Sequence, residues 1–144
     1  ESFTFDIEQD PFGQDKPTFY VTEDTSRGAL RRLTPDNNTL QECYNKNGNY
    51  ERWCSLDSGT LEFLVFRDNG TFYWSSDLDD GRKSARTYYR NSEGIDSHGG
   101  KLYFTSKYEK TLIILDLRAM TWSKDSTQAG EFSAQPDQIR FIVG

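Results

Sequence analysis

The feature that most constrains the fold of this chain is a unit of four short β-strands that occurs twice. Each copy opens with a glutamate, Glu1 in the first and Glu93 in the second. A third copy is expected to start at residues 137–142. Four antiparallel strands per repeat form the blade of a β-propeller. The sequence therefore predicts an all-β chain of about two and a half four-stranded propeller blades.

The strands are predicted from short β-type runs with Gly, Asp and Asn turns between them. They are 1–6, 19–22, 29–33 and 61–66 in the first copy, and 93–96, 102–106, 112–115 and 121–122 in the second. Residues 10–17, which contain two prolines, are expected to form a surface loop. The chain then divides into a blade at 1–76, an irregular connection at 77–92 that allows a short helical turn, a blade at 93–130 and the start of the next blade at 131–144.

The chain is too short for a complete propeller. A closed ring needs at least about four blades of roughly 40 to 50 residues each, whereas this chain has 144 residues. We therefore expect a piece of a longer protein, and the absence of an initiator methionine agrees with that expectation. The remaining segments of the same propeller, or a partner chain, are expected to cover the exposed flanks of the blades.

The composition excludes several classes of partner. The net charge of −6, from 17 Lys and Arg against 23 Asp and Glu, has the wrong sign for a nucleic-acid-binding protein. No apolar run is long enough to cross a bilayer. Hydrophobic residues make up only 34% of the chain, but the aromatic 15% falls mostly within β-type runs, which indicates a folded β protein.

Cysteines and glycosylation tripeptides favour a secreted setting. Cys43 and Cys54 flank a polar, Asn-rich stretch and are expected to form a disulfide, with two reduced surface thiols as the alternative. The tripeptides that begin at Asn37 and Asn69 predict N-glycosylation on exposed turns, although such tripeptides are also common by chance. Together these features predict an extracellular or secreted protein.

The candidate metal ligands are five carboxylates next to strand ends: Glu1, Glu23, Asp24, Glu93 and Asp137. The first strand of each blade lines the central channel, so the acids that open the three copies are expected to converge on one axis. Glu23 and Asp24 end a second strand, from which they are expected to add oxygens at the rim. Converging carboxylates repel one another unless a cation neutralises them, and oxygen ligands favour Ca²⁺. In the alternative interpretation, these acids are solvated or hydrogen-bonded to turn amides.

Four groups of short motifs follow one another along nearly the whole chain: Glu1-Ser2-Phe3; 19–25 with 28–32; 91–95 with 102–104; and 135–139. At these motifs the chain resembles the middle portion of the PhoX-type alkaline phosphatase family. The resemblance implies a propeller whose channel carboxylates hold calcium ions, iron bound partly through a cysteine, and hydrolysis of phosphate esters. Carried over by motif, Glu1 and Glu93 are channel metal ligands, and Glu23, Asp24 and Asp137 are further candidates.

Some motifs of the family are missing from this chain. The family's cysteine and paired glutamates are expected before Glu1, and further acidic motifs after Gly144. Iron is therefore expected only together with the missing upstream segment, and this chain alone is expected to be inactive. Cys43 and Cys54 have no counterpart among the family's motifs.

Two functions follow as hypotheses. The first is a segment of a secreted, PhoX-like, calcium-binding β-propeller that hydrolyses phosphate esters through its metals. The alternative is a non-catalytic extracellular structural or binding propeller module, because a fold can persist without its chemistry. A sugar-binding propeller, suggested only by the aromatic content, is a third hypothesis.

Overall fold

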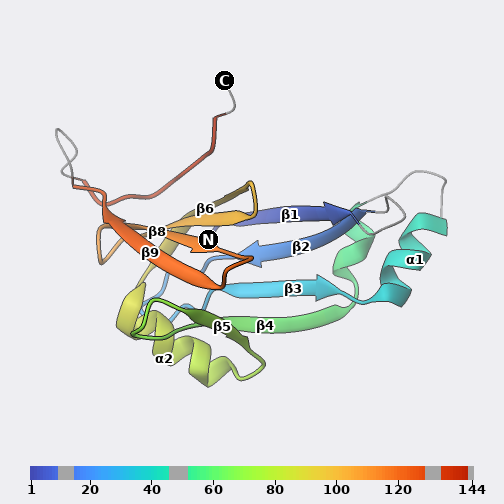
Figure 1. Cartoon of the computed structure of the whole chain (residues 1–144), viewed down its shortest axis with the longest axis horizontal. Coiled ribbons are helices and arrows are strands. Elements are labelled where there is room, and N and C mark those ends of the chain that lie inside the picture. Colours follow the sequence, from blue (N-terminus) through green and yellow to red (C-terminus); the bar gives the residue numbers. More distant parts are fainter. Residues whose placement is uncertain (10–14, 46–51, 129–133, 143–144) are drawn as a thin grey trace.

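Two antiparallel β-sheets make up most of the structure, which is a computed structural model (Figure 1). It describes residues 1–9, 15–45, 52–128 and 134–142. The first sheet has five strands in the order β1-β2-β3-β4-β5, and the second has four in the order β6-β7-β8-β9. Strands that follow one another in the chain are therefore neighbours in each sheet, which is the order of a simple antiparallel meander.

The second sheet confirms all four strands expected in the second copy. Its strands are β6 (Ser92–His98), β7 (Lys101–Ser106), β8 (Thr111–Asp116) and β9 (Thr121–Ser126). Each is longer than predicted, because pairing with a neighbour extends a strand past its apolar residues. The turn after β6 contains Gly99 and Gly100, both with positive φ, which glycine adopts without steric cost.

The first sheet differs from the prediction in three places. Its strands are β1 (Phe3–Gln9), β2 (Asp15–Val21), β3 (Arg31–Pro35), β4 (Gly59–Phe66) and β5 (Phe72–Ser75). The fifth strand was not predicted. β3 begins at Arg31, two residues later than expected, and the two residues before it, Ala29 and Leu30, are buried. The surface loop expected at 10–17 is wrong for its last three residues, which belong to β2, while 10–14 lie outside the described residues. Pro17 fits in β2 because it pairs with β1 only, at Ile7.

A helix longer than predicted connects the two sheets. The helix α2 (Leu78–Tyr88) fills most of the connection at 77–92, where the sequence predicts at most a short helical turn. Asp77 caps its first turn by accepting a backbone N–H hydrogen bond at 2.8 Å. The helix packs along β4, where Gly81 fits against Phe63 so closely that a Cβ on the glycine would lie 2.5 Å from the Phe63 Cβ. Its buried residues are small or polar, which hides the helix from a hydrophobic pattern.

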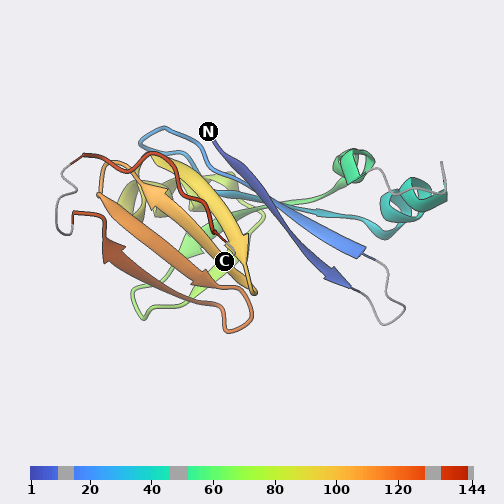
Figure 2. The same cartoon turned by 90° about the horizontal axis from the view of Figure 1, so that it is seen from above.

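The two sheets pack face to face around a shared aromatic core. Phe66 of β4 stacks on Trp122 of β9 with the ring centroids 4.3 Å apart. Tyr89 is fully buried just after α2 and meets the ring of Phe104 edge-on, with the centroids 5.5 Å apart. Its hydroxyl donates to the carbonyl of Leu64 at 2.9 Å, which satisfies its polar atom inside the core. Figures 1 and 2 show the second sheet covering one half of the first.

The third copy does not begin with a strand. Residues 137–142, which the sequence predicts as a strand, have no strand assignment. They pass beside β6, where the backbone N–H of Gly94 donates to the carbonyl of Asp137 at 2.7 Å. The approach is this close because Gly94 has no side chain, and a Cβ there would lie 2.5 Å from the backbone nitrogen of Ile139. This contact alone does not make a ladder, so the strand prediction is wrong.

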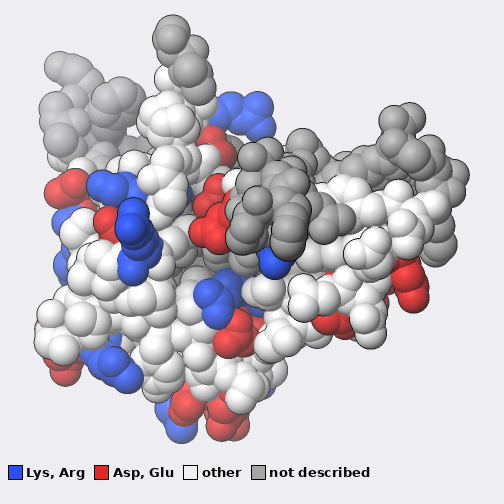
Figure 3. All heavy atoms as spheres, turned by 45° about the vertical axis from the view of Figure 1, so that its right-hand side comes forward, with Lys and Arg blue, Asp and Glu red and all other residues white. Residues whose placement is uncertain are grey.

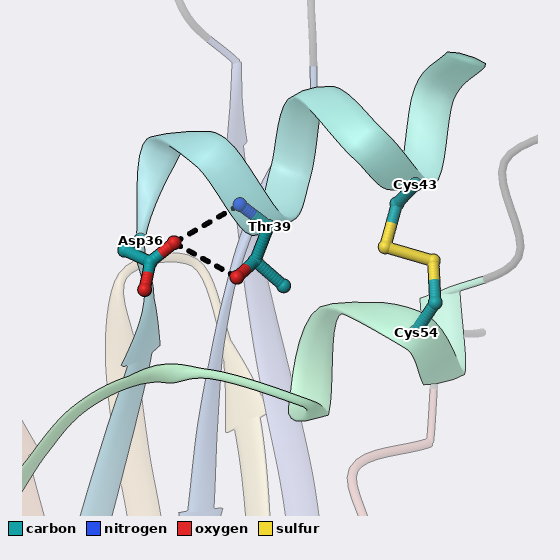
Figure 4. Close-up of a disulfide and its surroundings, with 4 residues drawn as sticks. All are labelled: Asp36, Thr39, Cys43 and Cys54. Atoms are coloured by element: carbon teal, nitrogen blue, oxygen red, sulfur yellow. Dashed lines mark hydrogen bonds between the residues drawn. A yellow bond between two sulfur atoms is a disulfide. The ribbon is translucent and has the colours of Figure 1, made fainter. Parts of the chain in front are cut away.

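The expected disulfide joins two short helices at one end of the first sheet (Figure 4). Cys43 of α1 (Asn37–Asn45) is bonded to Cys54 of the 3₁₀-helix η1 (Arg52–Leu56). Both helices lie between β3 and β4 in the chain, where the sequence predicts only a polar loop. The disulfide prediction is confirmed, and the two-thiol alternative is wrong.

Candidate functional site

Glu93 is the most buried of the predicted metal ligands, with 5% of its surface exposed. It is the second residue of β6, and its Oε1 accepts a hydrogen bond from Nζ of Lys107 at 2.9 Å. The same ammonium lies 3.6 Å from Oδ2 of Asp24. The other oxygen of Asp24 accepts a hydrogen bond from the side-chain amide of Asn91 at 2.9 Å. One lysine thus joins two of the predicted acids, Asp24 in the turn after β2 and Glu93 in β6.

Backbone contacts hold the turn after β2 against the start of β6. The hydroxyl of Thr22, itself fully buried, donates to the carbonyl of Glu93. The backbone N–H of Asn91 donates to the carbonyl of Thr25 at 3.0 Å, and that of Lys107 donates to the carbonyl of Asn91 at 2.9 Å. The charged side chains are therefore placed by main-chain and buried hydroxyl contacts as well as by their own ion pairs.

The charged groups of the site shift one another's pKa values. Burial raises the pKa of the Glu93 carboxyl; the hydrogen bond from Lys107 opposes this rise and the neighbouring Asp24 carboxyl adds to it. The hydrogen bond from Asn91 is the main cause that lowers the pKa of Asp24. The hydrogen bond to Glu93 raises the pKa of Lys107. The amino-terminal ammonium of Glu1 also pairs with Glu93, so two positively charged groups lie beside the two carboxylates.

The other three predicted ligands are placed in different ways. Glu1 approaches the site through its amino group, which lies 3.9 Å from Oε2 of Glu93 and is a cation instead of the predicted carboxylate ligand. Asp137 is close enough to the lysine of the site to contribute to its raised pKa. Glu23 instead forms an ion pair with Arg31, whose Nη2 lies 2.7 Å from its Oε2. The carboxylate of Glu23 therefore pairs with Arg31 instead of with Lys107.

The carboxylate oxygens of the site are of the type that binds calcium, but they are too few to fill its coordination shell. Ca²⁺ takes about six to eight oxygen ligands, and Asp24 and Glu93 supply carboxylate oxygens. Among the described residues, no group of three or more His, Cys, Asp or Glu side chains is placed to hold one ion together. The further oxygens must therefore come from water or other groups. A pocket of about 220 Å³ beside the pair offers space for them and has these lining residues: Asp24, Asn91, Lys107, Tyr108 and Gln135.

The sequence interpretation missed Lys107 and Asn91. Lys107 directly follows β7, and the pairing of Ser92 with Ser106 brings the end of β7 next to the start of β6. A basic residue just after the partner of an acid-opened strand is the signal that points to it. Asn91 has a φ of 53°, a left-handed conformation in which asparagine is enriched, and this turn directs its amide toward Asp24.

The two predicted glycosylation sites lie in different settings. Asn69 lies in the exposed turn between β4 and β5, as expected, and its side-chain oxygen accepts the N–H of Thr71 at 3.1 Å. Asn37 is also exposed, but it begins α1 instead of lying on a turn. The hydroxyl of Thr39 in its tripeptide donates to the carboxylate of Asp36 at 2.8 Å (Figure 4). The turn predicted at Asn37 is therefore wrong, and glycosylation at both sites stays a prediction.

The surface carries both signs of charge. On the face drawn in Figure 3, Asp and Glu side chains are interspersed with Lys and Arg side chains rather than separated into one basic area. None of the helices in the described part of the chain has the length and apolar character needed to cross a bilayer, in agreement with the expectation of no membrane span.

Comparison of this protein with family models, with curated proteins and with solved structures found no match. The resemblance to the PhoX family therefore stays a prediction that rests on the motifs in the sequence.

Proposed function

We propose that this chain forms two neighbouring blades and the start of a third blade of a β-propeller, in which Glu93 and Asp24 bind Ca²⁺ near the axis. We further propose, from the resemblance to the PhoX family, that the whole protein is a secreted hydrolase of phosphate esters. The observation that carries the proposal is the buried carboxylate of Glu93. This residue lies at the start of an inner strand, and the carboxylate of Asp24 lies beside it.

The arrangement of the inner strands supports two adjacent blades. β1 and β6 are the first strands of their sheets and lie next to each other, with the hydroxyl of Ser97 donating to the carbonyl of Phe5 at 2.7 Å. Residues 138–140 approach the same place, so the opening segments of all three copies border one cavity of about 370 Å³. In a propeller, the first strands of successive blades surround the central channel.

Apolar side chains on the outer face of the first sheet support a further blade or a partner chain. Phe3 of β1 is 43% exposed and Leu61 of β4 is 49% exposed. Alternation along β4 places Leu61 on the opposite face from the core residue Leu64. A blade inside a propeller packs on both faces, so we propose the remaining segments of the same propeller as the partner that covers this face.

The chemistry expected of the site follows from its charges. Bound Ca²⁺ supplies positive charge that polarises the oxygens of a phosphoryl group. In this chain, Glu93 and Asp24 would hold the ion, and Asn91 orients Asp24 through its amide. Iron would take its cysteine ligand from the upstream segment, because Cys43 and Cys54 are bonded to each other.

Isothermal titration of the 144-residue chain with CaCl₂ tests the metal site. We expect saturable binding that Glu93→Gln weakens by at least about tenfold, because the variant removes a ligand charge and keeps the side-chain shape. Glu42→Gln, on the exposed surface of α1, is the matched control and leaves the affinity unchanged. A wild-type chain that releases no binding heat with CaCl₂ and gains no thermal stability from it would refute the metal site.

The second candidate function is a non-catalytic extracellular structural or binding module. The observation in its favour is Lys107, which already supplies positive charge to both carboxylates. Hydrolysis of p-nitrophenyl phosphate by the protein from its natural source, with and without a calcium chelator, separates the two functions. Calcium-dependent hydrolysis supports the hydrolase, and calcium binding without hydrolysis supports the module.

A further inference from the structure

The edge of the second sheet holds a segment from near the end of the chain. Among the described strands, β6 is the outermost of its sheet, and residues 137–141 lie along it. We propose that this part of β6 is a docking site for an extended peptide of a partner protein, and that the chain's own residues 137–141 occupy it as a resident ligand. The inference goes beyond the proposed function, because it depends neither on calcium nor on phosphate esters.

Three contacts join the segment to β6. The backbone N–H of Gly94 donates to the carbonyl of Asp137 at 2.7 Å. Oδ2 of Asp96 accepts a hydrogen bond from the backbone N–H of Phe141 at 2.6 Å. The ring of His98 stacks on the ring of Phe141, with the centroids 3.7 Å apart and the planes within 10° of parallel. Residues 94, 96 and 98 alternate along the strand, so one side of β6 presents all three contacts.

These contacts recognise an extended backbone and one aromatic side chain. Asp137 contributes its carbonyl and Phe141 its N–H, and both groups are present in almost any peptide. The side chains of Asp137 and Arg140 are exposed. A ligand therefore needs a carbonyl and an N–H at the spacing of residues 137 and 141, with an aromatic ring on the second of these residues. Recognition of this kind is typical of peptides that bind along the edge of a sheet.

Gly94 allows the close approach that this recognition requires. A Cβ on Gly94 would lie 2.5 Å from the backbone nitrogen of Ile139 and 2.6 Å from Cα of Gln138. Glycine within a strand often marks a place where another backbone or a ligand comes close. Any side chain at this position would therefore block a bound peptide as well as the resident segment.

A cavity beside the docked segment adds a preference for an apolar residue. Residues 138–140 form one wall of the cavity of about 370 Å³ between β1 and β6. Ile139 is half-buried there, and Phe3, Phe5 and Ile95 also line the cavity. We therefore expect the partner peptide to carry an apolar side chain two positions before its aromatic residue.

The resident segment is held loosely enough to be replaced. Phe141 is 43% exposed and Ile142 is 85% exposed, and residues 137–142 have no strand assignment. Segments that bury little apolar surface open at a low cost in free energy. Because the segment belongs to the same chain, it competes at an effective concentration that is on the order of millimolar for short linkers. The resident segment therefore sets the affinity that a partner must exceed.

The test is an NMR titration of the 144-residue chain with a synthetic peptide that has the sequence of residues 134–142. Phe141→Ala in the chain removes the resident ring, so the amide of Gly94 should exchange faster with solvent than in the wild type. At millimolar concentrations, we expect the peptide to bind this variant about two- to tenfold more tightly than the wild type, because the competing segment has lost one stacked ring. Bound peptide should restore the protection of the Gly94 amide.

A second substitution locates the bound peptide. His98→Ala, added to the Phe141→Ala chain, removes the ring on which the aromatic residue of the peptide stacks, so the peptide should bind about two- to tenfold more weakly. Lys101→Ala is the matched control and should leave the affinity unchanged, because Lys101 is exposed and pairs with His98 across the same hairpin. A peptide with alanine in place of its phenylalanine should bind equally with and without His98→Ala.

Each outcome decides for or against the docking site. Unchanged exchange of the Gly94 amide in Phe141→Ala overturns it, and so does a peptide that fails to bind this variant or binds equally with and without His98→Ala. Concentration-dependent dimers of the wild type that His98→Ala abolishes would support the site and identify a second copy of this chain as the partner. None of these readouts uses calcium, so their failure is distinct from failure of the proposed function.

Discussion

The α1–η1 segment and the start of β6 lie at opposite ends of the first sheet and are held by different kinds of contact (Figure 1). In α1–η1, the disulfide joins residues 11 apart, and the cap of the helix joins residues three apart. At the start of β6, Lys107 contacts Glu93 from 14 residues away, and Asn91 contacts Asp24 from 67 residues away. The first region is therefore built from local contacts, whereas the contacts of the second region with Asp24 form only when the two sheets are assembled.

This difference predicts that the two regions respond differently to substitutions. Local contacts depend on a few neighbouring residues, so their loss should disorder only their own segment. Long-range contacts depend on the packing of both sheets, so damage to the core should also remove the candidate metal site. The following variants test this comparison, beginning with the largest expected effect.

Phe104→Ala should break the assembly of the two sheets. Phe104 is fully buried and meets Tyr89 edge-on in the shared core, so truncation leaves a cavity at the interface. We expect a loss of about 3–5 kcal/mol in the free energy of unfolding, measured by urea denaturation, with loss of calcium binding as the chain unfolds. Leu61→Ala, at an exposed position on the outer face, is the control and should cost much less. Equal losses for the two variants would contradict a core between the sheets.

Removal of the disulfide should disorder α1–η1 and leave the sheets intact. Cys43→Ser with Cys54→Ser removes a cross-link that closes a short loop, and we expect the local opening of this segment to become easier by about 3 kcal/mol. Hydrogen exchange should show faster exchange of the α1 amides and unchanged protection in β7 and β8. Loss of protection throughout both sheets would show that the segment is not an independent local unit.

Gly94→Ala should displace the segment 137–139 from β6. The added Cβ would lie 2.5 Å from the backbone nitrogen of Ile139, so one of the two segments must move. We expect a loss of about 1–3 kcal/mol in stability and faster hydrogen exchange at residue 94, whose N–H now donates to Asp137. Gly99→Ala is a useful contrast: a Cβ there has no neighbour within 4 Å, and its cost comes only from the positive φ. A Gly94→Ala chain with unchanged exchange at residue 94 would contradict the close approach.

Lowering the pH should weaken the Asp36 cap of α1, and this is the smallest of the four expected effects. Hydrogen bonds from the backbone and hydroxyl of Thr39 lower the pKa of Asp36. Since the folded pKa is below the unfolded one, the stabilisation is present above the ordinary Asp pKa of about 3.9 and is lost as the pH falls through the folded value. The NMR shift of the Thr39 amide should follow this titration. Asp36→Asn, which keeps the acceptor but does not titrate there, should abolish it.

The sequence predicted the second sheet and the disulfide well because their signals are local. The runs Leu102-Tyr103-Phe104 and Leu112-Ile113-Ile114-Leu115 are strongly β-forming, and Gly99-Gly100 marks the first hairpin turn. By contrast, α1 and α2 were missed or shortened because their polar sequences give no apolar stripe. The caps Asp36 and Asp77, together with packing or a disulfide, stabilise helices that the hydrophobic pattern does not reveal.

The residues of the candidate site also fall into those that the sequence predicted and those that it did not. The sequence identified Glu93 and Asp24 as acids next to strand ends, which is a local property. It did not identify Lys107 or the ion pair that holds Glu23 with Arg31, because both depend on which strand ends meet. The register of β6 with β7 and the packing of the turn after β2 decide those neighbours.

By itself, the sequence determined that this protein is mainly β, where most of its strands and turns lie, and that its cysteines pair. These properties follow from residue preferences over a few positions, which act before any tertiary contact forms. Only the tertiary structure decided that two sheets pack face to face, that Asp24 meets Glu93, and that Lys107 lies between them. Those features depend on strand register and on packing between residues far apart in the chain, for which a single sequence carries no direct signal.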